Sequence, residues 1–275
     1  MLLPALNRAK IAADSTACRS NLRQIALGMN MYVQQERVHP DASRWPLQLR
    51  PFVGASWPEN NYKSSDPNPN GSWVGLSYLR SGSGVYACPA YSRMKGIFMS
   101  RTISDYIYDW TGLGSYGYNT WSWVNSTIPW SGLGGYFATG QPQPATVSPA
   151  WLPTRENQVV VPSDMISLAD APLFCAANDD PTSDTAPSGL SNLGKDLTAF
   201  YDRTYLTILR GLPVNDPSVR WMKLRHAGRW NTVFCDGHVE SLRAKKLFDF
   251  SDPNVARRWN TDHQPHSDLL PKPPP

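Results

Sequence analysis

The feature that most limits how this chain can fold is a long N-terminal run of helix-forming residues. From Ala5 to Gln35 the sequence contains no Pro and a single Gly, Gly28, while Ala, Leu, Arg, Gln and Met dominate. Residues of these types have high helix propensity, so we expect one long helix. The part of its apolar face from Cys18 onward should lie against a sheet. The whole face recurs at helical spacing and consists of Leu6, Ala9, Ala13, Cys18, Leu22, Ile25, Met29 and Tyr32.

A β-hairpin is predicted near the C-terminus. Thr232 to Cys235 is rich in β-formers, Asp236-Gly237 is a dipeptide favoured where both turn residues need positive φ, and His238 to Leu242 alternates polar and apolar residues. Val159–Val161 and Met165–Asp170 predict two further strands. Together they predict an α+β fold, in which the helix covers a small antiparallel sheet.

Composition favours short strands and long ordered loops over a helical bundle. Only 17% of the 275 residues are charged, whereas the chain holds 25 Pro and 19 Gly. The net charge of +4 is mild and no run is rich in Lys or Arg, so no nucleic-acid partner is expected. No apolar span of membrane length occurs. Enzyme signatures such as a phosphate loop or a nucleophile elbow are absent, and we expect neither catalytic residues nor enzymatic activity.

Four cysteines are spread along the chain without a Cys-x-x-Cys pair, which argues against a zinc ribbon or a thioredoxin-like motif. An even number permits two disulfides in an oxidising compartment, and four buried free thiols are the alternative. Cys18 with Cys88 and Cys175 with Cys235 are the preferred pairs, because each joins a core-facing position to a neighbouring strand or loop.

His226, Asp236 and His238 are the candidate site residues. Metal ligation requires all three to converge on one ion, and catalysis requires a base within hydrogen-bond reach of its proton. The alternative is structural, in which His226 and Asp236 form hydrogen bonds that hold the hairpin. A metal-dependent hydrolase built on these three residues is the weakest of the functional hypotheses.

Aromatic residues interleaved with Gly and Ser crowd the middle of the chain. Such rings either pack a loop-rich core or form a surface on which sugars stack, so a glycan-binding module of an extracellular protein is the second functional hypothesis. Within residues 106–137 these residues are Tyr106, Tyr108, Trp110, Tyr116, Tyr118, Trp121, Trp123, Trp130, Tyr136 and Phe137.

The two ends of the chain resemble bacterial type IV pilin-like proteins and type II secretion pseudopilins. The apolar start Leu2-Leu-Pro-Ala-Leu6, followed by the helix containing Cys18-Arg-Ser-Asn-Leu22, is similar to the region after the membrane segment of those proteins. His226, nine residues and Asp236-Gly237 match the C-terminal motif of a large pseudopilin subgroup found in planctomycete- and verrucomicrobia-type bacteria. Cys88-Pro89 fits the same pattern. The basic leader and most of the apolar segment that begin family members are missing from this sequence.

The resemblance implies a structural subunit of a filament in a type II secretion or type IV pilus-like system. Residues 1–38 would form the helical spine, 39–261 a globular β domain with large loop insertions, and 262–275 a Pro-rich extended tail. Such a subunit is made as a prepilin, is anchored in the inner membrane through the missing segment, and then assembles with copies of itself and other pilus or secretion subunits in the periplasm or at the cell surface. Family members often bind calcium, for which the resemblance points to Asp179-Asp180 or Asp170.

Overall fold

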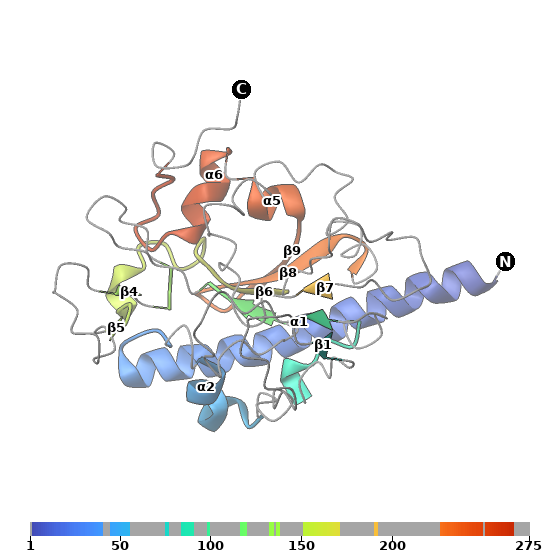
Figure 1. The fold of residues 1–275 in the computed structure, drawn as a ribbon, viewed down its shortest axis with the longest axis horizontal. Helices are drawn as coiled ribbons and strands as arrows, with labels where there is room; N and C mark the ends of the chain where they lie inside the picture. Colours follow the sequence, from blue (N-terminus) through green and yellow to red (C-terminus); the bar gives the residue numbers. More distant parts are fainter. Residues whose placement is uncertain are drawn as a thin grey trace.

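The computed structural model describes residues 2–40, 45–55, 75–76, 84–90, 98–99, 116–119, 132–134, 136–137, 151–170, 190–191, 226–249 and 251–266. Helices and strands alternate irregularly along these segments (Figure 1). In chain order they are α1 (Leu2–Glu36), α2 (Trp45–Val53), β1 (Gly75–Leu76), η2 (Gly84–Tyr86), β2 (Phe98–Met99), β3 (Tyr116–Tyr118), β4 (Tyr136–Phe137), β5 (Trp151–Leu152), η4 (Glu156–Gln158), β6 (Ile166–Asp170), β7 (Leu190–Ser191), β8 (Arg229–Phe234), β9 (Val239–Arg243), α5 (Ala244–Phe248), α6 (Pro253–Ala256) and η6 (Arg257–Trp259).

The main sheet has four strands in the order β3-β6-β8-β9, and every neighbouring pair is antiparallel. β6 and β8 are its central strands and are buried on both faces, except for Arg229. Two short ladders, β1-β2-β7 and β4-β5, are separate from this sheet, although their strands are interleaved with its strands along the chain. The expected α+β class with a small antiparallel sheet is therefore confirmed. The strand expected at Val159–Val161 is wrong, because these residues follow the short 3-10 helix η4 without joining a ladder.

Helix α1 covers one face of the main sheet. Cys18, Leu22, Ile25 and Met29 are buried in one core with Leu168 of β6 and Val233 of β8. The Ser167 hydroxyl lies 3.0 Å from the sulfur of Met29, which brings the helix close to β6. This part of the predicted apolar stripe is confirmed because its spacing of three and four residues keeps it on one side of the helix.

Tyr32 does not continue the stripe onto the sheet as expected. Its ring packs edge-on against Phe52 of α2, with centroids 6.0 Å apart, and its hydroxyl accepts a hydrogen bond from Gln48 at 3.1 Å. Val33 is the buried residue at this level of the helix. The sheet and α2 therefore pack against different sides of the last turns of α1.

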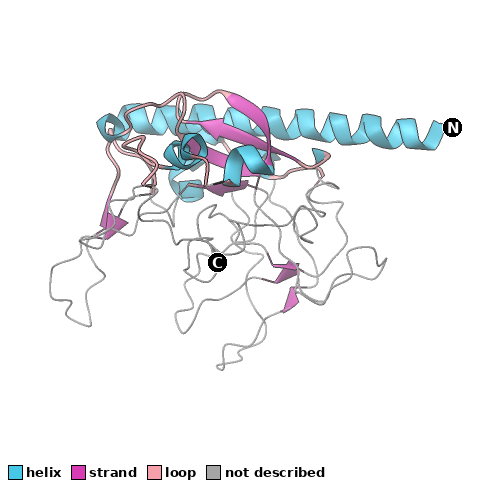
Figure 2. Ribbon diagram, turned by 90° about the horizontal axis from the view of Figure 1, so that it is seen from above, coloured by secondary structure: helices cyan, strands magenta, loops and turns pink. Residues whose placement is uncertain are grey.

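The N-terminal part of α1 extends beyond the strands of the sheet (Figures 1 and 2). Every residue from Pro4 to Lys10 is exposed, and the side chain of Leu6 has 67% of its surface exposed. Ala9 and Ala13 are exposed as well. Among the described residues, no helix is both long enough and apolar enough to traverse a bilayer.

Gly28 lets α2 approach α1 closely. A Cβ at this position would overlap Cγ2 of Val53. We expect Gly28→Leu to lower the free energy of unfolding by about 2 kcal/mol, because overpacking a well-filled contact outweighs the gain in helix propensity. Urea unfolding measures this change, with Gln24→Leu on the exposed side of the same helix as the control. A Gly28→Leu variant as stable as the parent would contradict the close packing.

The C-terminal segment covers the opposite face of the sheet. The Trp259 indole donates to the Leu247 carbonyl at 2.8 Å, and the Arg258 guanidinium lies 4.7 Å from the centroid of the Phe234 ring. Residues 262–266, the described part of the expected tail at 262–275, form hydrogen bonds with one another and with Asn260. Asn260 donates to the Gln264 carbonyl at 2.7 Å, and His266 pairs with Asp262. Residues 267–275 lie outside the described residues.

Candidate functional site

The hairpin that carries Asp236 and Gly237 is confirmed, but its turn differs from the expected one. The Phe234 carbonyl accepts from the Gly237 N–H at 2.9 Å, and the Phe234 N–H donates to the His238 carbonyl at 3.0 Å. Gly237 has φ +92°, whereas Asp236 has no positive φ. This is a three-residue loop whose last residue is left-handed, so only the glycine requires the special conformation.

Asp236 and His238 form an exposed pair on this turn. One carboxylate oxygen of Asp236 accepts from the backbone N–H of His238 at 3.0 Å and lies 2.6 Å from its Nδ1. The imidazole stacks on Phe234, with ring centroids 4.3 Å apart and planes at 5°. The pair thus stabilises the turn, in agreement with the structural role expected for Asp236.

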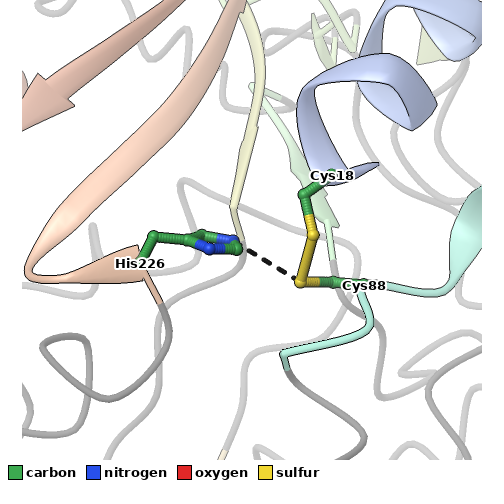
Figure 3. Close-up of side chains that lie close together, drawn as sticks. All are labelled: Cys18, Cys88 and His226. Atoms are coloured by element: carbon green, nitrogen blue, oxygen red, sulfur yellow. Dashed lines mark hydrogen bonds between the residues drawn. A yellow bond between two sulfur atoms is a disulfide. The ribbon is translucent and has the colours of Figure 1, made fainter. Parts of the chain in front are cut away.

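His226 lies at the other end of β8, where it is buried and only 2% exposed. Its Nε2 is 3.5 Å from the sulfur of Cys88 and 3.4 Å from Oδ2 of Asp170. Figure 3 shows the imidazole directed at the bond between Cys18 and Cys88. A buried imidazole therefore lies between a disulfide and a buried carboxylate.

The three predicted site residues do not converge on one point. His226 precedes β8 and Asp236 follows it, and six residues of extended strand span about 20 Å. His226 is buried against Cys88, whereas His238 is exposed beside Asp236. The hypothesis that His226, Asp236 and His238 share a metal ion is therefore wrong, as is the hydrolase built on it. The three residues are close in sequence, but the length of β8 keeps His226 far from Asp236 and His238.

The disulfide between Cys18 and Cys88 is present, as expected, with the two Cα atoms 5.3 Å apart. It ties α1 to the segment 84–90, where Asn21 also donates to the Ala87 carbonyl at 2.9 Å. The second expected pair is not formed, because Cys235 is a free cysteine; Cys175 lies outside the described residues. Burial and the neighbouring Asp236 carboxylate raise the pKa of the Cys235 thiol, which keeps it protonated at neutral pH.

Buried polar groups continue from the disulfide across the sheet. Oδ2 of Asp170 accepts the Asn231 N–H at 2.8 Å, and both residues are fully buried. Among the described residues, Nδ1 of His226 and both side-chain amide atoms of Asn231 have no hydrogen-bond partner. Such groups are costly in a core, so their clustering makes this region the candidate site.

Sequence reasoning named Asp170 only as a calcium ligand implied by resemblance, and it did not single out Asn231. The alternation of side chains between the two faces of β8 is the sequence signal that could have identified Asn231. Val233 belongs to the core under α1, and Asn231, two positions earlier, lies on the same side of the strand. A polar residue in a core-facing position of a central strand is therefore the pattern that would have found it.

The spacing within the His226 to Gly237 motif follows from how β8 runs along α1. His226 lies beside Cys18, while a Cβ at Gly237 would be 3.0 Å from the side-chain nitrogen of Asn30. Cys18 and Asn30 are separated by twelve helical residues, about 18 Å, which is close to the length of β8. The two ends of the motif therefore contact the helix more than three turns apart. The two ends of the motif therefore belong to one strand that lies along one helix, and they do not form one site.

These contacts define the class of the protein as α+β, with a long helix fastened to an antiparallel sheet by a disulfide at one level and a tight turn at another. Comparisons with protein-family models, curated proteins and solved structures found no match for this chain. Of the aromatic region, Tyr116 and Tyr118 are buried in the core, Tyr136 and Phe137 form β4, and the remaining six aromatic residues lie outside the described residues. Asp179 and Asp180 lie outside them too.

Proposed function

We propose that this protein is a pilin-like structural subunit of a filament in a secretion or pilus system. The observation that carries the proposal is the N-terminal part of α1, which extends past the sheet and leaves apolar residues such as Leu6 exposed. An exposed apolar stripe on a projecting helix favours packing against other helices. The resemblance of both chain ends to pseudopilins supports the same role.

The attachment of α1 to the sheet suits a helix that transmits load. The disulfide to Cys88 holds it at Cys18, its buried face holds it through Met29, and the hairpin turn abuts Asn30. A helix held at several levels moves with its globular domain as one body, which a subunit stacked in a filament requires. The disulfide also favours an oxidising compartment, in agreement with assembly in the periplasm or at the cell surface.

Substitution of Leu6 tests the proposal. We expect Leu6→Glu to reduce the filament-associated protein at least about tenfold in the natural host, since burying an unpaired carboxylate between helices costs more than about 1.4 kcal/mol. Filaments sheared from the cells and quantified by immunoblot provide the measurement. Leu47→Glu on α2 is the matched control, because Leu47 is also an exposed leucine, at 48%, but belongs to the globular part.

Two results would contradict the proposal. One is normal assembly of the Leu6→Glu protein at parental abundance. The other is an equal loss in Leu6→Glu and Leu47→Glu, which would indicate a general effect of added charge rather than a helix-mediated contact. The absence of enzymatic activity and the presence of calcium remain predictions from the sequence, as does glycan binding by residues 106–137.

A further inference from the structure

The cluster around His226 has the composition of a metal site as well as of a disulfide. The sulfur atoms of Cys18 and Cys88 and a ring nitrogen of His226 all lie within 4.8 Å of one another, and all three residues are buried. Among the described residues, this is the only group of three or more His, Cys, Asp or Glu side chains close enough together to hold an ion. Asp170 is not a member of this group, but its carboxylate oxygen lies 3.4 Å from Nε2 of His226.

We propose that, when the disulfide is reduced, Cys18, Cys88 and His226 bind a zinc ion, with Asp170 as the fourth ligand. Two thiolates, an imidazole and a carboxylate are a donor set that zinc accepts in tetrahedral geometry. This proposal is independent of the filament role. It concerns the state of the protein wherever its thiols are kept reduced.

The two observed distances from Nε2 of His226 fit a tetrahedral site, whereas the Cys18 sulfur and the Asp170 oxygen must shift to complete it. With Zn–S of about 2.3 Å and Zn–N or Zn–O of about 2.0–2.1 Å, neighbouring ligands lie about 3.6 Å apart for N and S and about 3.3 Å apart for N and O. In the structure Nε2 of His226 is 3.5 Å from the Cys88 sulfur and 3.4 Å from the Asp170 oxygen. Two reduced sulfurs need a separation of about 3.8 Å in the same geometry. Reduction itself moves them apart, because the covalent bond no longer holds them.

The position of the ligands makes this a structural site. Cys18 belongs to α1, Cys88 to the segment 84–90, Asp170 to the end of β6, and His226 to the start of the hairpin. All four are buried, so the coordination sphere is closed to substrate. The ion would join the same elements that the disulfide joins, which allows one residue set to hold the fold in either redox state.

Reduction of the disulfide and binding of the ion each conserve electrons and protons. A small dithiol reductant supplies two electrons and two protons, its own sulfurs become a disulfide, and the Cys18–Cys88 bond becomes two thiols. Zinc then displaces the two thiol protons, which leave to solvent, and His226 binds through Nε2 with its proton on Nδ1. Asp170 contributes its ionised carboxylate.

Cobalt substitution provides the test, because thiolate ligation of Co²⁺ produces a charge-transfer band and tetrahedral d–d bands. The purified protein is reduced with a dithiol, freed of reductant under anaerobic conditions, and titrated with Co²⁺ and then Zn²⁺. We expect uptake of one metal ion per chain after reduction, none in the oxidised protein, and displacement of cobalt by zinc. The variant Cys175→Ser/Cys235→Ser, which lacks the other two thiols, should bind like the parent.

Ligand variants assign the site. We expect His226→Gln to weaken cobalt binding by more than about 100-fold and Asp170→Asn by about 10-fold to 100-fold, since even outer-shell changes commonly cost that much. His238→Gln, on the exposed turn, should leave the affinity unchanged. Far-UV circular dichroism and thiol counts of the oxidised His226→Gln protein show whether it still folds and still forms the disulfide.

Three results would overturn the proposal. The reduced parent could take up no cobalt, the Cys175→Ser/Cys235→Ser variant could lose the spectrum, or a folded His226→Gln protein could bind as tightly as the parent. Unchanged affinity in Asp170→Asn would overturn the place of Asp170 as fourth ligand.

Discussion

Replacing both Cys18 and Cys88 by serine should lower the free energy of unfolding by about 4 kcal/mol. The two residues are 70 positions apart, and closing a loop of that length in the unfolded chain removes about this much conformational entropy. The sequence between them includes the second half of α1 and all of α2, so the link restricts a large part of the unfolded ensemble. Urea unfolding of the oxidised parent and of the variant measures the difference.

The matched control for this prediction is Cys235→Ser, which removes a cysteine that carries no disulfide. Reducing the parent in the presence of a chelator should reproduce most of the loss, because it breaks the same link without changing a side chain. If the double variant and the reduced parent both lost less than about 1 kcal/mol, the bond would not contribute as the loop entropy requires.

The protein should also lose stability in acid through His39. This residue is 6% exposed, and its backbone N–H donates to the Thr154 carbonyl at 2.7 Å. Within the described part of the chain, the ring nitrogen Nδ1 has no hydrogen-bond partner. Burial lowers the pKa of His39 from 6.5 to about 4, and the Glu156 carboxylate opposes this shift only in part. The folded protein therefore holds His39 neutral at pH values where the unfolded chain binds a proton.

The sign of the effect follows from that difference in proton binding. Above about pH 6.5 both states carry a neutral His39 and its contribution to stability is complete; as the pH falls toward about 4, the unfolded state is stabilised by protonation. The shift corresponds to a loss of about 3 kcal/mol over this window. Urea unfolding at several pH values should show a steeper decline for the parent than for His39→Gln, which cannot titrate there. Parallel pH dependences in the two proteins would contradict the prediction.

Together, these contacts explain why His226 and Asp236-Gly237 can occur at fixed spacing without forming one site. Each end of the motif meets α1, one beside Cys18 and the other beside Asn30. A change in the length of β8 would move one of these contacts along the helix. The spacing of the motif therefore reflects how β8 is aligned along α1.

The local elements were predictable because their signals are local. The absence of Pro and the propensities between Ala5 and Gln35 predicted α1 within a few residues, and Asp236-Gly237 predicted the hairpin. The buried stripe from Cys18 to Met29 followed from helical spacing. Val159–Val161 failed because a β-rich run forms a strand only where a neighbouring strand is available to pair with it.

The site was less predictable because its members come from distant parts of the chain. His226 and Cys88 are 138 residues apart, and nothing in the sequence near either residue states that they meet. His238, by contrast, was grouped with His226 because it is near in sequence, although an extended strand separates them. By itself, the sequence determined a long helix, a hairpin and the cysteines that can pair. Only the tertiary structure decided that His226 lies beside the disulfide and Asp170, because burial and long-range packing, not spacing along the chain, bring these groups together.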